Sequence, residues 1–222
     1  MRFAAIETST EWCSVALWND GEIAGVERHA GQRHSELALP MLQGLLEKTN
    51  ANAGMLDAIA FGAGPGSFTG LRIACGLAQG LALPHGLPVI GISTLEALAE
   101  ESGAARVVAC LDARMREVYY AALEKDRGRW REVVPVQCVA PHAAQSPAGD
   151  GWIGCGSGFA AFPEFLQNKI TAMHPEIHPN ALAVARLAAP RLAAGEGVDA
   201  AEAAPLYVRD KVALTSQELA AR

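Results

Sequence analysis

The chain has 222 residues and a formal net charge of −6 at pH 7; half of its residues are hydrophobic and 19% are charged. This composition supplies enough apolar material for one large or two small domains, and it argues against intrinsic disorder. It also argues against a protein whose own surface binds nucleic acid, because the arginines at 127, 129 and 131 form no larger basic cluster and are expected at a solvated hairpin tip.

Cysteine usage and hydropathy indicate the compartment. The five cysteines are odd in number, widely spaced and never form a CxxC pair, which predicts reduced thiols in the core of an intracellular protein. No secretory signal opens the sequence, and no uncharged apolar run is long enough to span a membrane. We therefore expect a cytoplasmic protein with no membrane partner.

Hydrophobic periodicity predicts a regular order of elements in the first half of the chain. Strands are expected over 2–7, 12–18 and 22–29, then a helix from Ser35, a strand over 56–61, a helix over 69–83, a strand over 88–92 and a helix over 94–101. The sequence Asn19-Asp20-Gly21 predicts a hairpin between the second and third strands. Pro40 predicts a bend near the start of the first helix.

The second half begins by repeating the first. Strands are expected over 107–112, 118–123 and 130–139, followed by a strand over 151–154 and helices over 159–167 and 181–194. In both halves an apolar strand ends in a carboxylate, at Glu7 and at Asp112, and a hairpin follows. The repeat predicts two related lobes, over 1–104 and 105–222, with the last residues packing back on the first lobe.

Each predicted lobe is a βββαβα unit, so the expected fold is α/β and duplicated. This arrangement resembles the actin, Hsp70 and sugar-kinase superfamily, whose lobes are RNase H-like. In that superfamily the carboxylates matching Glu7 and Asp112 face magnesium and nucleotide phosphates. With Gly154 and Gly156 they form a candidate vestigial nucleotide site, although the residues after each carboxylate are bulky where glycines are usual. The alternative is that both carboxylates only end strands and accept hydrogen bonds.

The glycine-rich segment over 64–70 lies between a predicted strand and a predicted helix, where backbone N–H groups can face an anion. It lacks the lysine and hydroxyl residue of a Walker A loop, because Leu71 and Arg72 follow Gly70. It also lacks the third glycine of a dinucleotide fingerprint, whose place is taken by Thr69. We favour a structural role in which the glycines allow a tight turn and close packing, with Ser67 or Thr69 as the N-cap.

Several motifs in chain order are specific to one family: Ile6–Glu11, His34–Glu36, Leu39–Met41, Gly64–Ile73, Ser93–Ala97, Leu111–Met115, Glu117–Tyr119 and Pro205–Arg209. They resemble TsaB, also called YeaZ. The resemblance implies a non-catalytic scaffold and activator that pairs with TsaD and acts with TsaE and TsaC. Their product is N6-threonylcarbamoyladenosine, beside the anticodon of tRNAs that read codons beginning with A, and the tRNA is expected to bind only through the complex.

Metal and cofactor chemistry finds little support in the residues. The helix of TsaD that matches Thr94–Leu98 carries two metal-binding histidines, whereas Thr94 and Leu98 are not useful ligands. His174 and His178 are four residues apart, but the prolines at 175 and 179 oppose a regular helix. We expect no metal and no cofactor, with weak nucleotide binding left open. The alternative function is an independent nucleotide-dependent phosphotransferase or metallopeptidase of the same superfamily.

Two helices are the predicted interaction surface, since the family uses them for homodimers and for pairing with TsaD. Gly76 and Gly80 lie on one helix face and permit close approach of another helix. The helix from Ser35 has more apolar residues than one stripe needs. The expected contact residues are Leu37, Met41, Leu45, Thr69, Ile73, Gly76, Leu77 and Gly80. The alternative is that both helices pack only within their lobe. The C-terminal motif over 205–211 receives no predicted chemistry.

Overall fold

Each half of the chain builds a five-stranded sheet of the same topology. The structure is a computed structural model and describes residues 1–209. The first sheet has the order β3-β2-β1-β4-β5, from Glu22–His29, Trp12–Asn19, Arg2–Glu7, Ala58–Gly64 and Val89–Ser93. The second has the order β8-β7-β6-β9-β10, from Arg129–Val139, Val118–Asp126, Arg106–Asp112, Trp152–Cys155 and Ile170–His174.

The pairing confirms the predicted duplication. In both sheets the first three strands are antiparallel, and the first strand also pairs in parallel with the fourth. The two hairpin tips are alike as well: Asp20 and Gly21 both have positive φ, and so do Arg127 and Gly128. Such two-residue turns match the right-handed twist of their strands. This is the two-lobed α/β fold of the actin, Hsp70 and sugar-kinase type.

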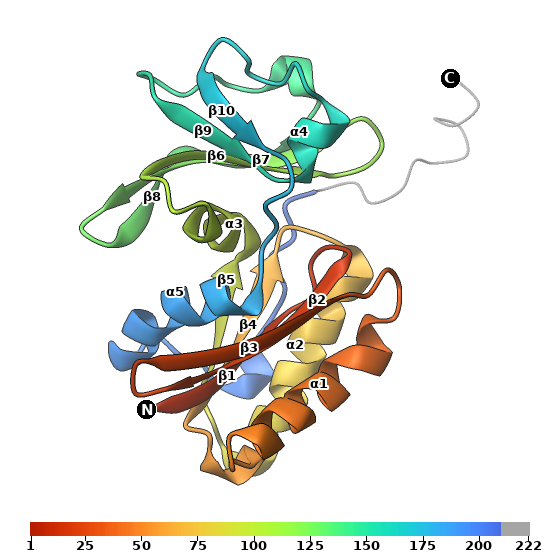
Figure 1. Cartoon of the computed structure of the whole chain (residues 1–222), viewed down its shortest axis with the longest axis vertical. Helices are drawn as coiled ribbons and strands as arrows, with labels where there is room; N and C mark the ends of the chain where they lie inside the picture. The colour runs from red at the N-terminus through yellow and green to blue at the C-terminus, as the bar shows by residue number, and fades with distance from the viewer. Residues whose placement is uncertain (210–222) are drawn as a thin grey trace.

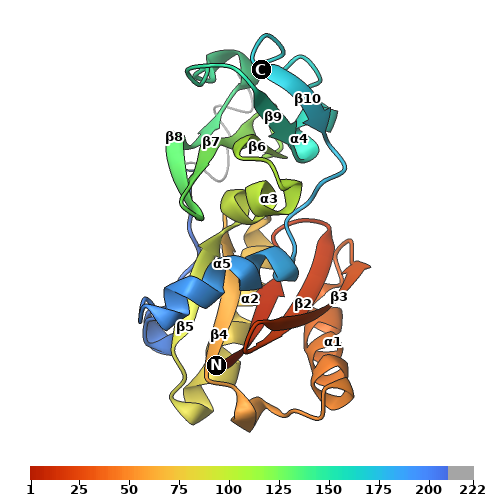
Figure 2. The ribbon, with the colours of Figure 1, turned by 60° about the vertical axis from the view of Figure 1, so that its left-hand side comes forward.

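The helices cover the first sheet on both faces. Helices α1 (His34–Lys48) and α2 (Phe68–Ala82) lie side by side on one face, whereas α5 (Ala181–Ala193) lies on the other (Figures 1 and 2). Strand alternation serves both layers: Ala4 and Ile6 of β1 face the core under α1 and α2, and Phe3 and Ala5 face the core under α5. Helix α5 follows the second sheet in the chain but packs on the first.

One hydrophobic core joins the two halves. Helix α3 (Thr94–Ser102) lies between the sheets, and its Leu95 and Leu98 share a cluster with residues of β1, β6 and α5. A separate core fills the second lobe, where α4 (Ser157–Ala161) packs on β6. The five cysteines form no disulfide with one another. None of the helices over 1–209 has the length and apolar character to cross a membrane.

Two sequence predictions between residues 157 and 175 were wrong. The helix expected over 159–167 is the short α4, which ends before Phe162. Pro163 explains this end, because proline has no N–H to donate and drives the preceding residue into an extended conformation; Phe162 has φ −135° and ψ 77°. Strand β10 was not predicted. It is a short edge strand, and its alternating pattern is too brief to separate from a loop.

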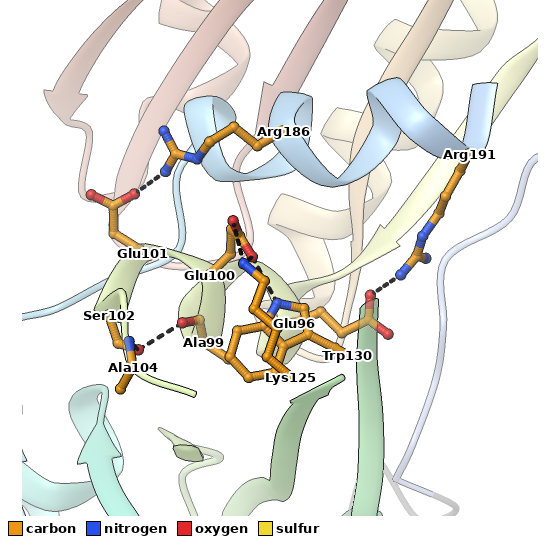
Figure 3. A network of polar contacts seen from close by, with 10 residues as sticks. All are labelled: Glu96, Ala99, Glu100, Glu101, Ser102, Ala104, Lys125, Trp130, Arg186 and Arg191. Carbon is orange, nitrogen blue, oxygen red and sulfur yellow. Dashed lines mark hydrogen bonds and ion pairs between the residues drawn. The ribbon is translucent and has the colours of Figure 1, made fainter. Parts of the chain in front are cut away.

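Three glutamates of α3 pair with groups on both sides of this helix (Figure 3). Glu96 pairs with Arg191 of α5, and Glu101 pairs with Arg186 of α5 at 2.7 Å. Glu100 faces the other lobe. Its carboxylate accepts hydrogen bonds from Lys125 Nζ of β7 at 2.7 Å and from Trp130 Nε1 of β8 at 2.8 Å. Helix α3 is therefore tied by charge to α5 on one side and to the second sheet on the other.

We expect Glu100→Ala to lower the free energy of unfolding by about 2 kcal/mol, because the Lys125 ammonium and the Trp130 N–H lose their shared, largely buried acceptor. Urea unfolding measures the change. Glu196→Ala is the matched control: its ion pair with Arg129 is exposed and long, at 3.5 Å, so the loss should stay below about 0.5 kcal/mol. Equal losses in the two variants would contradict the role given to Glu100.

Candidate functional site

The glycine-rich loop is filled by the protein's own backbone. A Cβ atom at Gly70 would lie 1.9 Å from the carbonyl oxygen of Thr8, and one at Gly66 would lie 2.6 Å from that of Ser9. Ser67 N–H donates to the Ser9 carbonyl at 2.7 Å, and Thr8 Oγ1 donates to the Gly70 carbonyl at 2.7 Å. The turn after β1 therefore occupies the concave side of the loop, where an anion would have to sit.

The same loop is closed from a second direction by the C-terminal segment. Leu206 N–H donates to the Ala63 carbonyl at 2.7 Å, and a Cβ at Gly64, where φ is +120°, would lie 2.7 Å from the Leu206 carbonyl. The N-cap of α2 is Ser67, whose hydroxyl accepts the Gly70 N–H at 3.3 Å. Of the two predicted caps, Thr69 is thus inside the helix. The glycines serve close approach of three chain segments.

Glu7 lies inside the first lobe, with only 1% of its surface exposed. Its Oε1 accepts the Ser9 N–H at 2.6 Å, whereas Oε2 has no hydrogen-bond partner within residues 1–209. Burial raises the pKa of Glu7 above its ordinary value, against the lowering effect of its hydrogen bonds to Ser9 and Thr8. Gly62 leaves room for this carboxyl, because a Cβ there would lie 1.9 Å from Oε2. The Glu7 carboxyl is therefore enclosed by protein atoms rather than open to solvent.

Asp112 is neutralised by the turn that follows it. One carboxylate oxygen accepts the Arg114 N–H at 2.8 Å, and the other pairs with the Arg114 guanidinium at 3.2 Å. Arg114, Met115 and Arg116 all have left-handed backbone, with φ of 60°, 54° and 63°. Three side chains therefore project from this turn. Catalytically active members of the superfamily usually have glycines at the corresponding place, so that backbone amides can approach phosphate.

The glycines of the second lobe are also used for packing. A Cβ at Gly154 would lie 2.6 Å from the ring of Phe159, and one at Gly156 would lie 2.3 Å from the Cys110 carbonyl. Together with the contacts of Glu7 and Asp112, these distances mean that the residues do not fit a magnesium–nucleotide complex. Asp112 is paired with Arg114, the unpartnered Oε2 of Glu7 is buried beside Gly62, and the glycine turns face protein atoms.

The described residues also offer no metal cluster. Within residues 1–209, no three His, Cys, Asp or Glu side chains are placed to hold one ion. His174 and His178 turn to different carboxylates: His174 Nδ1 lies 3.2 Å from Glu176, and His178 Nε2 lies 2.9 Å from Glu27. His174 ends β10 and His178 lies in no helix, which confirms the expectation that the neighbouring prolines oppose a regular helix here.

The predicted contact residues of α1 and α2 divide by exposure. Thr69, Gly76 and Gly80 are exposed, Leu37, Ile73 and Leu77 are half-buried, and Met41 and Leu45 are buried, at 8% and 7% exposure. Met41 and Leu45 belong to the core between α1 and the sheet. No other group lies within 4 Å of a Cβ built at Gly76 or Gly80. The glycine stripe of α2 is thus open to a partner.

Sequence reasoning missed three large apolar side chains that are exposed on α1 and at the two ends of α2. Leu39, Phe68 and Leu83 are exposed by 38%, 50% and 56%. Their signal is an apolar residue off the stripe that faces the sheet. Arg72 is the one charged residue in the sequence of α2, and its guanidinium lies 3.2 Å from the Phe68 ring centroid. The exposed side of α2 is therefore mostly apolar or bare backbone, as at helix–helix interfaces.

Known proteins resemble this chain over nearly its whole length. The model of the family described as "TsaD: tRNA N6-adenosine threonylcarbamoyltransferase" matches residues 26–216. The chain is 38% identical over 223 aligned residues to the tRNA threonylcarbamoyladenosine biosynthesis protein TsaB of Escherichia coli K12, covering 96% of each chain. The chain belongs to the TsaB family. TsaB of Haemophilus influenzae is also 38% identical, over 94% of this chain and 93% of the relative.

Solved structures of TsaB relatives, under the name YeaZ, have the same fold. YeaZ from Pseudomonas aeruginosa superposes with a TM-score of 0.87 at 38% identity, covering 93% of this chain and 99% of that one. A second Pseudomonas aeruginosa structure, described as an uncharacterized protein with similarity to peptidase YEAZ, gives 0.89 at 38% identity, with 94% and 99% coverage.

In this TsaB chain the two α3 positions that were compared, Thr94 and Leu98, supply no metal ligand. Thr94 and Leu98 are both fully buried, and Thr94 Oγ1 has no hydrogen-bond partner among the described residues. Leu98 belongs to the core shared by the two lobes. The face of α3 on which Thr94 and Leu98 lie is thus committed to packing.

We expect Gly70→Ala to lower the free energy of unfolding by about 3 kcal/mol, because a methyl group cannot fit 1.9 Å from the Thr8 carbonyl without moving backbone. Gly76→Ala, in the same helix, should instead raise stability by about 1 kcal/mol, since its Cβ meets open space and alanine favours helix. Thermal and urea unfolding of the pair measures the contrast. Destabilisation of similar size at both positions would contradict the packing role of Gly70.

Glu7→Gln should raise stability, and the gain should increase with pH. Because the pKa of Glu7 is raised in the folded chain, the unfolded chain loses this proton first, and stability falls as pH rises from the ordinary pKa of 4.5 through the raised one. Glutamine removes that loss. Urea unfolding of both proteins between pH 5 and pH 8 should show the difference widening with pH. A difference that does not change with pH would count against a titrating Glu7.

Proposed function

We propose that this chain is a non-catalytic subunit that pairs with TsaD and supports its formation of N6-threonylcarbamoyladenosine in tRNA. The observation that carries the proposal is the near full-length similarity to TsaB of Escherichia coli, which is named for this pathway. The match to the TsaD family over residues 26–216 supports descent from a shared ancestor with the proposed partner. We further infer that it works in the cytoplasm, beside TsaE and TsaC.

The absence of a catalytic role is supported by the contacts at the vestigial site. Glu7 is enclosed by protein, with 1% of its surface exposed, and Asp112 is paired with the Arg114 guanidinium, which is the arrangement expected of carboxylates without a catalytic task. A metallopeptidase would need metal ligands on α3, where Thr94 and Leu98 stand. A phosphotransferase would need bare backbone beside the phosphates, where Gly66 and Gly70 meet the Thr8 and Ser9 carbonyls.

The pairing surface that we propose is the outer face of α1 and α2. Gly76 and Gly80 permit another helix to lie against the backbone, and the half-buried Ile73 and Leu77 flank them. Phe68 and Leu83 extend the apolar face to both ends of α2. A chain of related fold would present two equivalent helices to it, so TsaD in the complex and a second copy of this chain alone are suitable occupants. On this proposal the tRNA is bound only through the complex.

Gly76→Trp should abolish co-elution with TsaD in size-exclusion chromatography, because an indole at this position holds the partner helix away from the α2 backbone. Its circular dichroism and melting temperature should stay close to those of the natural chain. Ala193→Trp is the control, since Ala193 is exposed on α5, on the other side of the sheet. Undiminished TsaD binding by Gly76→Trp would contradict the proposed surface.

The same variants test the function in a reconstituted reaction. TsaC, TsaD and TsaE, supplied with their substrates and tRNA, should yield modified adenosine only when this chain is added. Gly76→Trp should reduce the yield at least tenfold, whereas Ala193→Trp should not. Turnover of ATP by this chain alone, lost on Asp112→Asn, would instead establish an independent enzyme.

A further inference from the structure

The C-terminal segment over 205–209, here called the strap, passes from the first lobe to the second (Figure 1). It is fixed to the first lobe by the bond from Leu206 N–H to the Ala63 carbonyl. Just before it, the Ala203 carbonyl accepts a hydrogen bond from Gln79 Nε2 of α2 at 3.1 Å. At its other end, Arg209 contacts the turn between β6 and β7. The strap thus connects two places that are distant in the sequence.

Arg209 holds the second lobe through one guanidinium nitrogen that faces three oxygen acceptors. Its Nη2 lies 2.8 Å from the Ala113 carbonyl, 2.7 Å from Glu117 Oε2 and 3.4 Å from the Arg114 carbonyl. The side chain is only 15% exposed, and its guanidinium lies 5.6 Å from the Tyr119 ring centroid. Charge-assisted hydrogen bonds from a largely buried guanidinium are among the stronger polar contacts in proteins.

The turn that Arg209 contacts is conformationally unfavourable by itself. Three consecutive residues over 114–116 are left-handed, and none of them is glycine. Side chains clash with their own backbone in that region, so such a turn persists only where its surroundings hold it. Arg209 supplies part of that support, because one guanidinium nitrogen faces the carbonyls of both Ala113 and Arg114.

The other end of the strap lies on the exposed start of α2. The ring of Tyr207 is 6.1 Å from that of Phe68, and both side chains are about half exposed. The Arg72 guanidinium lies 3.2 Å from the Phe68 centroid and 5.3 Å from the Tyr207 centroid. Only one residue separates Tyr207 from Arg209. Displacement of the Tyr207 ring would therefore shift the backbone of Arg209 and weaken its hydrogen bonds to the turn.

We propose that the strap couples the start of α2 to the left-handed turn over 113–117, so that an event which displaces Tyr207 from Phe68 loosens that turn in the other lobe. The coupling is reciprocal, since loosening the turn must also weaken the contact on α2. It resides in the isolated chain and therefore holds whether or not TsaD is the partner.

Amide hydrogen exchange of the full chain tests the first step. The Ala113 and Glu117 amides are bonded across the turn, and the Arg114 amide is bonded to Asp112, so all three report its opening. Arg209→Ala should speed their exchange about tenfold, the factor for losing a hydrogen-bonded charge of this kind. Arg129→Ala, which removes an exposed ion pair at the hairpin end of β8, away from this turn, should leave them unchanged. Unchanged exchange in Arg209→Ala would overturn the proposal.

A glycine variant separates support of the turn from general destabilisation. Arg116→Gly removes the steric penalty of a left-handed residue, so in the Arg209→Ala background it should return the turn amides toward their slow exchange. Exchange of the β6 amides should not follow. If Arg116→Gly fails to slow the turn amides, Arg209 does not act by holding the left-handed conformation, and the proposal is wrong.

The coupling itself is tested from the α2 end. Tyr207→Ala should speed exchange of the turn amides severalfold while Arg209 is still present. In the reverse direction, Arg209→Ala should speed exchange of the Gly70 and Leu71 amides, which are bonded to Ser67 at the start of α2. Tyr207→Ala without effect on the turn would show two independent anchors and would overturn the coupling.

Discussion

The contact between the turn after β1 and the glycine-rich loop is the constraint on which the other features depend. It brings two backbone segments together so closely that no side chain fits between the Thr8 carbonyl and Gly70. The contact fixes the start of α2 against the end of β1, and so determines which face of α2 turns outward. It also occupies the Ser67 N–H, a donor of the loop that could otherwise face an anion, by bonding it to the Ser9 carbonyl. The glycine-rich loop, whose sequence resembles a phosphate-binding loop, therefore serves to pack chain segments together. The helix that follows it, α2, presents an exposed face.

The glycines of α2 show which part of this site could be predicted from the sequence and which could not. The role of Gly70 depends on Thr8, which is 62 residues away, so the spacing of glycines indicated close packing but not its partner. Gly76 and Gly80 were predictable as one open face, because helical periodicity is a local property. Met41 and Leu45 followed the same periodicity, yet they lie in the core, since a helix with two apolar stripes does not reveal which stripe faces the sheet.

The duplicated topology was predictable for a similar reason: alternation, hairpin signals and the terminal carboxylates recur in the same order. The exceptions lie where tertiary contacts decide. The left-handed turn over 114–116 had no signal, because arginine and methionine rarely adopt that conformation, and only Arg209 and Asp112 explain it. Pro163 could have warned that the helix expected over 159–167 ends early. The short strand β10 forms because β9 provides an edge for it.

The position of α5 has a consequence for how the protein is made. Helix α5, which covers the face of β1 that carries Phe3 and Ala5, is synthesised only after the whole second sheet. While the ribosome completes the chain, the face of β1 that carries Phe3 and Ala5 is without its cover, and its closure requires contacts across more than two thirds of the sequence. Such long-range closure slows folding and exposes apolar surface to aggregation. An isolated fragment ending near residue 104 would lack α5 and leave that apolar face of β1 exposed. The N-terminal lobe is therefore a topological repeat and not an independently folding domain.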